Sequence, residues 1–273
     1  MNAIVLMAIG KKYLNLLNTL KDQFASYAKK CNAELIICTA APDPSFKRSI
    51  LSQKMLLPHL YSQYEWIAFL DIDILISENA PSIFDSVVYE KAFAAIADLR
   101  GNKKFENVVN YYWHEPSILD ETHSSYFSDR GFPAHQNHHL SINGGVWLCQ
   151  PKKIAEKFKE FYYSDFKQIH HDHEEAMMAY IAQSSNIFYE LDYKFNTQLM
   201  FEIFNNPNSE VIDVIEGIYF KCLRKYNTHL PPHLYMYPAA YRALIIKLLS
   251  TQYIVHFSGG FPFINSIKSK INV

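Results

Sequence analysis

Glycine is scarce in this sequence, which has 8 glycines among 273 residues. At the average usage of about 7%, a chain of this length would have roughly 19. Four of the eight glycines form two doublets, Gly144–Gly145 and Gly259–Gly260. Because glycine has no side chain, it lets the backbone approach another group closely. In a chain that otherwise avoids glycine, the two doublets mark candidate positions for such an approach.

Other absences exclude whole classes of protein. The formal net charge is −1, which gives no basis for electrostatic binding of nucleic acid. The apolar segment Ala3–Ile9 is too short for a membrane span or a secretory signal, and no later apolar run reaches membrane length without charge. The cysteines form no C-x-x-C pair, which is typical of reduced thiols in a cytoplasmic protein. They are Cys31, Cys38, Cys149 and Cys222.

Hydrophobic residues make up 49% of the chain, which is enough for a large core and argues against disorder. Apolar runs of strand length alternate with segments that carry apolar residues at helical spacing. This alternation predicts an α/β fold with a mostly parallel central sheet flanked by helices, in which ligands bind beyond the carboxyl ends of strands. The predicted elements are a strand at Ala3–Ile9, a helix at Lys11–Lys30, a strand at Glu34–Thr39, a helical segment at Phe46–Tyr64 and a strand at Trp66–Leu70.

Two carboxylates follow the last of these strands. Asp71 and Asp73 flank Ile72, and in an extended chain their side chains point the same way, roughly 6.6 Å apart. A divalent cation between them would turn their repulsion into a shared attraction, because carboxylate oxygens are hard ligands suited to Mg²⁺ or Mn²⁺. From this stretch alone, the alternative is a strand that ends in a solvated acidic turn.

Further polar groups accompany the later predicted elements. A region of polar and aromatic residues at 101–140 shows no core pattern and is predicted to be an irregular insertion. Asp98 follows a strand at Lys91–Ala97, Asn143–Gly144–Gly145 precedes an apolar strand, an acidic segment opens a helix within His170–Gln183, and His256 stands in the sequence H-F-S-G.

The order of D-x-D, N-G-G, an acidic helix start and H-F-S-G resembles the retaining, metal-dependent glycosyltransferases of the GT-A fold. It is similar to the family of glycogenin and the bacterial lipopolysaccharide galactosyl- and glucosyltransferases (family eight), and also to the related galactosyl/xylosyltransferases. The resemblance implies one Rossmann-like domain over 1–273, with a nucleotide-binding half at 1–100, a sugar and acceptor half at 141–262 and a tail at 263–273. It also implies Mn²⁺ or Mg²⁺ as cofactor, held against a nucleotide diphosphate by Asp71, Asp73 and His256.

The same resemblance implies contacts to the donor. Tyr13 matches an aromatic residue that stacks on uracil, Asp98 matches a carboxylate that binds sugar hydroxyls, and Gly144 matches a small residue that admits the hexose ring. The implied nucleotide-binding residues are Ala8, Ile9, Tyr13, Lys54, Ile72 and Gly259, and the implied donor-sugar residues are Asp98, Asn143, Gly144, Asp172 and His173.

The catalytic carboxylate has three candidates. The family has an Asp–Gln pair near the anomeric carbon, and here either Asp172–His173 or Glu174–Glu175 matches it. Asp172 is the preferred match, with Glu174 and Glu175 as alternates. A carboxylate there would act as a nucleophile or stabilise an oxocarbenium-like transition state, whereas acidic residues are also favoured at helix starts for electrostatic reasons. A transition-metal cluster of His171, Asp172 and His173 is a further alternative. The chain departs from the family after Gly259–Gly260, where the family's diphosphate-binding lysine is absent.

These features predict a UDP-sugar-dependent hexosyltransferase that moves galactose or glucose, with retention, to a hydroxyl of a glycan or lipopolysaccharide-type acceptor. The alternatives are a nucleotide-sugar-binding protein without turnover and a nucleotidyltransferase on a related fold. The second would need a glycine-rich basic loop after the first strand, where the chain has only Gly10–Lys11–Lys12. We expect a cytoplasmic protein, with a peripheral membrane contact left open for basic and aromatic residues at Tyr237, Tyr241, Arg242, Lys247, Lys268 and Lys270.

Overall fold

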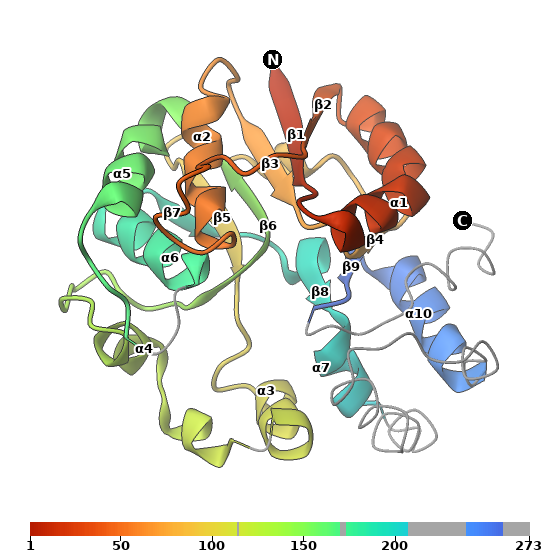
Figure 1. Ribbon diagram of the computed structural model, residues 1–273. Coiled ribbons are helices and arrows are strands. Elements are labelled where there is room, and N and C mark those ends of the chain that lie inside the picture. Colours follow the sequence, from red (N-terminus) through yellow and green to blue (C-terminus); the bar gives the residue numbers. More distant parts are fainter. Residues whose placement is uncertain (114, 170–172, 207–238, 259–273) are drawn as a thin grey trace.

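A six-stranded sheet with the strand order β2-β1-β3-β6-β5-β7 forms the centre of the molecule (Figure 1). The structure is a computed structural model that describes residues 1–113, 115–169, 173–206 and 239–258. The β1–β2, β1–β3 and β5–β7 pairs are parallel, and β6 runs antiparallel to β3 and β5. The predicted single α/β domain with a mostly parallel sheet is therefore confirmed. The strands are β1 (Asn2–Met7), β2 (Ala33–Cys38), β3 (Ile67–Leu70), β5 (Phe93–Ala97), β6 (Ile142–Cys149) and β7 (Phe188–Glu190).

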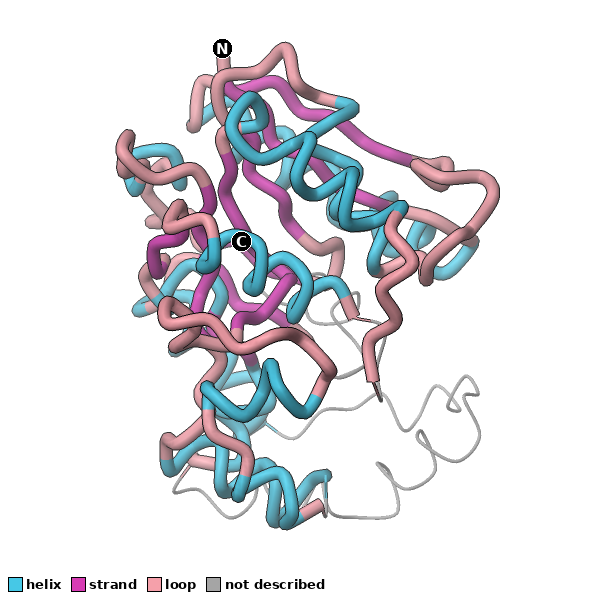
Figure 2. The backbone as a smooth tube through the Cα atoms, turned by 90° about the vertical axis from the view of Figure 1, so that its left-hand side faces the viewer, coloured by secondary structure: helices cyan, strands magenta, loops and turns pink. Residues whose placement is uncertain are grey.

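Helices cover both faces of this sheet (Figures 1 and 2). The long helix α1 covers one face, and α5 and α6 cover the other. No helix among the described residues is both long and apolar enough to cross a membrane. The helices are α1 (Lys11–Lys30), α2 (Leu57–Leu60), α3 (Lys103–Val108), α4 (His123–Asp129), α5 (Pro151–Tyr163), α6 (Glu174–Ser184), α7 (Leu199–Phe204) and α10 (Ala239–Thr251).

Strand β3 contributes to two separate hydrophobic cores. Ala68 and Leu70 pack into the core on the α1 side, whereas Ile67 and Phe69 pack into the core beneath α5 and α6. Trp147 of β6 stacks on Phe69 with ring centroids 5.2 Å apart. Because all four β3 side chains are fully buried, the strand has no place for a charge before its carboxyl end.

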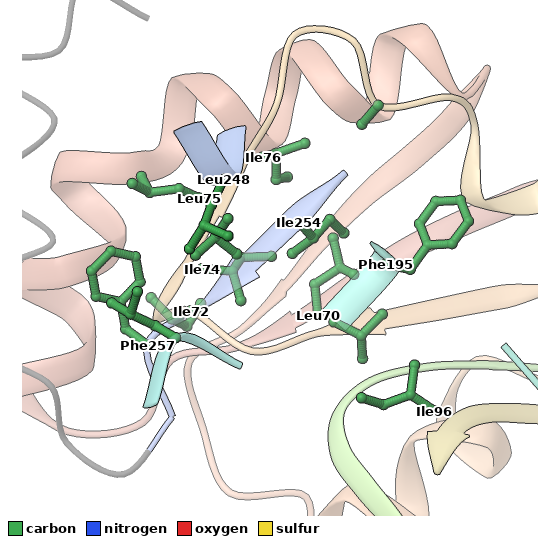
Figure 3. Close-up of a cluster of buried hydrophobic side chains, with 14 of the residues drawn as sticks. Leu70, Ile72, Ile74, Leu75, Ile76, Ile96, Phe195, Leu248, Ile254 and Phe257 are labelled. Atoms are coloured by element: carbon green, nitrogen blue, oxygen red, sulfur yellow. The ribbon is translucent and has the colours of Figure 1, made fainter. Parts of the chain in front are cut away.

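A second, three-stranded sheet lies beyond that end, in the order β4-β9-β8. Figure 3 shows Ile72, Ile74 and Ile254 in one hydrophobic cluster with Phe195 and Phe257. The cluster attaches the small sheet to the core, although its strands come from distant parts of the sequence. They are β4 (Ile74–Ile76), β8 (Thr197–Gln198) and β9 (Ile254–His256).

Two predictions from the sequence need correction. Helical structure within Phe46–Tyr64 is confined to a 3₁₀ turn at Ser52–Leu56 and the short α2. At the start of this segment, the Asp43 carboxylate accepts hydrogen bonds from the backbone N–H groups of Ser45 and Lys47. These bonds to a side chain replace helical hydrogen bonds there. The insertion at 101–140 is not irregular throughout, since it contains α3, a π-helical turn at Val109–Trp113, a 3₁₀ turn at Pro116–Asp120 and α4.

Candidate active site

The acidic turn after β3 is fixed at both ends by backbone hydrogen bonds. Asp71 N–H donates to the Gly145 carbonyl, and Phe257 N–H donates to the Asp73 carbonyl, both at 2.8 Å. Between them, Ile72 is 2% exposed and packs into the core. With this anchor buried, the two carboxylates remain at the surface side of the turn, as the alternation of side chains predicts.

His256 lies against both carboxylates. It is paired with Ile74 across β4 and β9, and its Nε2 is 3.4 Å from Asp73 Oδ1 and 3.9 Å from Asp71 Oδ2. Within the described residues, these three side chains form a cluster whose potential ligand atoms all lie within 4.8 Å of one another. Two carboxylate oxygens and one imidazole nitrogen are a donor set that fits Mn²⁺ or Mg²⁺. The structure therefore brings together the three predicted metal ligands.

A buried lysine, Lys54, forms an ion pair with one carboxylate of this cluster. Lys54 Nζ lies 3.1 Å from Asp71 Oδ1 and 2.8 Å from Glu174 Oε1, and 3.3 Å from the Gly144 carbonyl. Burial raises the pKa of Asp71 to about 6, although the Lys54 ammonium opposes this shift. The Lys54 and Glu174 side chains are each 4% exposed. Lys54, the predicted nucleotide contact, thus pairs with one of the predicted metal ligands and with the first residue of α6.

Glu175 has a different environment from its neighbour. It is only partly buried, and its Oε1 accepts Gly144 N–H at 2.8 Å and Asn143 Nδ2–H at 3.2 Å. Burial and then the charge of Glu174 raise the pKa of Glu175 to about 7. Both glutamates lie in the first turn of α6 and face the N-G-G segment of β6.

The two glycines of this segment have distinct close neighbours. A Cβ at Gly144 would lie 2.9 Å from Glu174 Oε1 and 3.0 Å from Glu175 Cγ. A Cβ at Gly145 would overlap Cε1 of His256 and lie 2.6 Å from its Nδ1. The described structure thus gives each glycine a protein neighbour that excludes a side chain, in addition to the sugar ring expected at Gly144.

The remaining sugar-side candidates are placed around this centre. Asp98 follows β5 and caps its own turn, with Oδ1 accepting Arg100 N–H at 2.9 Å. Its carboxylate is 17% exposed and is also 3.5 Å from the Arg100 guanidinium. His173 is exposed at the start of α6. Asp172, Gly259 and the predicted tail at 263–273 lie outside the described residues.

On the nucleotide side, Ala8 is buried and donates its N–H to the Cys38 carbonyl at 2.8 Å, and Ile9 is partly exposed. Gly10 follows with φ +88°, a conformation that glycine adopts without strain, and turns the chain into α1. Tyr13 in the first turn of α1 is 42% exposed. Its pKa is raised by burial and by the charges of Asp73 and Asp71.

One residue of the site was not predicted. Asn196 is fully buried, and its Oδ1 lies 2.8 Å from Nδ1 of His256. It ends a 3₁₀ turn at Tyr193–Asn196 that follows β7. The sequence signal that singled out Asp71 and Asp98 was a polar residue directly after a strand, and it does not reach Asn196, which lies beyond β7 at the end of the next turn.

Comparison with known proteins gives a result at the level of structure. No protein-family profile matches the sequence, and no curated protein matches it. The apo structure of the bifunctional glycosyltransferase WbbM is similar to this chain with a TM-score of 0.55 and 13% identity, over 94% of this chain and 45% of WbbM. This chain has a GT-A glycosyltransferase fold.

Two further solved structures are similar at lower scores. Galactosyltransferase LgtC, in complex with donor and acceptor sugar analogues, has a TM-score of 0.49 and 13% identity over 95% of this chain and 87% of LgtC. Mouse xyloside xylosyltransferase 1, in its apo form, has a TM-score of 0.44 and 10% identity over 96% of this chain and 100% of its own. At such identities the likeness is one of fold.

The ion pair inside this GT-A fold leads to a prediction on stability. Lys54→Met is expected to lower the free energy of unfolding by about 3–5 kcal/mol, because it leaves the Glu174 carboxylate buried without a cation. Urea denaturation would measure the loss. The double variant Lys54→Met/Glu174→Gln removes both charges and is expected to recover most of it. A double variant as unstable as the single one would show that the buried charge is not the cause.

Glu175 leads to a prediction on pH dependence. A folded-state pKa raised to about 7 means that the folded protein keeps a proton that the unfolded chain loses near its ordinary pKa of about 4.3, so stability falls as pH rises between these values. Glu175→Gln keeps the acceptor for Gly144 N–H but cannot ionise. In metal-free buffer we expect it to stabilise the fold by about 1–2 kcal/mol at pH 8, less than the full shift because the carboxylate is partly exposed, and to be neutral near pH 4. Equal effects at both pH values would contradict the prediction.

Proposed function

We propose that this chain is a metal-dependent glycosyltransferase that moves a hexose from a UDP-sugar to a hydroxyl group of a glycan or lipopolysaccharide-type acceptor, with retention of configuration. The observation that carries the proposal is the cluster of Asp71, Asp73 and His256 at the carboxyl end of the central strand β3. In open α/β sheets this edge is where ligands bind.

Each part of the site has a place in this reaction. A bound Mn²⁺ or Mg²⁺ would neutralise the charge that develops on the leaving diphosphate. Tyr13, which is 42% exposed in the first turn of α1, would stack on the uracil. Asp98 and Asn143 would bind hydroxyl groups of the donor sugar. Positioning of the two substrates supplies much of the catalytic effect in a transfer of this kind.

Of the two described carboxylates at the start of α6, Glu175 is the better candidate for the group near the anomeric carbon. Glu174 is buried, and its Oε1 is paired with the Lys54 ammonium at 2.8 Å, so this carboxylate is engaged inside the protein. Glu175 is partly exposed and is oriented by Gly144 N–H and the Asn143 amide. A carboxylate held in this way would stabilise an oxocarbenium-like transition state or act as a nucleophile.

Incubation with Mn²⁺ and a panel of UDP- and GDP-sugars, with and without simple sugar acceptors, tests the proposal. We expect metal-dependent release of UDP from one hexose donor, stimulated by an acceptor hydroxyl. Binding of a donor without release would favour a nucleotide-sugar-binding protein, and absence of binding to every nucleotide sugar would contradict the assignment. Release of pyrophosphate from a nucleoside triphosphate and a sugar phosphate would favour a nucleotidyltransferase.

A further inference from the structure

The imidazole of His256 is connected to a backbone N–H through two side-chain amides. Gly145 N–H donates to Asn143 Oδ1 at 3.0 Å. Because a backbone N–H can only donate, this contact directs the oxygen of the Asn143 amide toward Gly145 and its NH₂ group away. That NH₂ group donates to Oε1 of Glu175, an atom that also accepts Gly144 N–H. The contact with Gly145 and the contact with Glu175 therefore require the same orientation of the Asn143 amide.

Asn196 transmits this orientation to the imidazole. Its Nδ2–H donates to Asn143 Oδ1 at 2.7 Å, which leaves its Oδ1 for Nδ1 of His256 at 2.8 Å. An amide oxygen can only accept, so the hydrogen of this bond belongs to the imidazole Nδ1. In a neutral imidazole the other nitrogen then carries the free lone pair. That nitrogen, Nε2, is the one that lies 3.4 Å from Asp73 and 3.9 Å from Asp71.

We propose that Asn196 is a positioning residue that selects the Nδ1–H tautomer of His256 and so presents the Nε2 lone pair to a divalent cation at Asp71 and Asp73. Without this acceptor, the neutral ring could place its hydrogen on Nε2 and donate to the Asp73 carboxylate, which would leave no lone pair at the cluster. Asn196 is fully buried, so in the folded protein the acceptor for Nδ1 is this side chain and not bulk solvent. The inference rests on the proposed function only in taking a divalent cation as the cofactor.

The test compares Asn196→Ala with a matched control, Asn205→Ala. The Asn205 side chain makes three hydrogen bonds, to Asn107, Lys104 and Phe201, and none of these three involves the site. Long-range ¹H–¹⁵N spectra, recorded as a pH series in metal-free buffer, report the tautomer of the neutral ring without any metal or donor. The His256 signal is assigned by its loss in His256→Gln. Mn²⁺ affinity is measured by electron paramagnetic resonance.

We expect the Nδ1–H tautomer in the wild type and in Asn205→Ala. In Asn196→Ala we expect a shift toward the Nε2–H tautomer and a loss of Mn²⁺ affinity of about 10–100-fold. An Nε2–H tautomer in the wild type, an unchanged tautomer or affinity in Asn196→Ala, or no Mn²⁺ binding by the wild type would each overturn the inference. A wild type that has the Nδ1–H tautomer and binds Mn²⁺, but turns over no donor, would contradict the proposed transferase activity alone.

Discussion

Asp73→Ala is expected to lower Mn²⁺ affinity by more than about 100-fold and to abolish metal-dependent donor turnover, while the fold is retained. Asp73 supplies one of the two carboxylates of the cluster, and its side chain is 32% exposed. Its backbone carbonyl, which accepts Phe257 N–H, is unaffected by the substitution. We therefore expect the free energy of unfolding to change by less than about 1 kcal/mol.

Calorimetric titration with Mn²⁺ and the donor-release assay would measure the two losses, and urea denaturation would measure stability. Glu160→Ala is a matched control, because Glu160 is an exposed acidic residue on α5. It should leave all three quantities unchanged. Unchanged turnover in Asp73→Ala would remove the acidic turn from the mechanism.

Gly145→Ala is expected to disrupt the same cluster from the opposite side. The new methyl group would overlap Cε1 of the His256 imidazole and lie 2.6 Å from its Nδ1. The ring cannot move freely because Asn196 holds its Nδ1. We expect loss of measurable Mn²⁺ binding and a decrease in the free energy of unfolding of about 1–3 kcal/mol, the usual cost of overpacking a buried position.

A double-mutant cycle with His256→Ala isolates the cause of this decrease. If the clash with the ring is responsible, Gly145→Ala will cost little in the His256→Ala background, where the ring is absent. The same loss in both backgrounds would instead point to a general weakening of β6. The cycle uses stability as its readout and therefore does not depend on activity.

The sequence predicted the parts of this molecule that depend on local patterns. The helix at Lys11–Lys30 and the alternation of strands and helices were confirmed, because apolar periodicity reports directly which face is buried. The clustering of Asp71, Asp73 and His256 also followed from the expected edge of the sheet together with family resemblance. The identity of the metal, the donor and the acceptor stay predictions.

What the sequence could not supply were contacts between distant side chains. Nothing near Lys54 in the sequence indicates that its ammonium is buried between Asp71 and Glu174. Likewise, the role of Asn196 depends on the direction of hydrogen bonds through Asn143, which is set by tertiary packing. The Phe46–Tyr64 prediction failed for a local reason, since periodicity does not register the capping of backbone N–H groups by Asp43.

The small sheet of β4, β9 and β8 has a thermodynamic consequence. It brings together Asp73 and His256, which are about 180 residues apart in the sequence, and closing a loop of that length costs conformational entropy. A ligand that binds only the closed arrangement stabilises it in proportion to its concentration and affinity. A divalent cation bound at the cluster would therefore act as a reversible cross-link between the two segments. The rate of amide hydrogen exchange in β9, which reports its local opening, would then fall as the fraction of protein with bound cation rises.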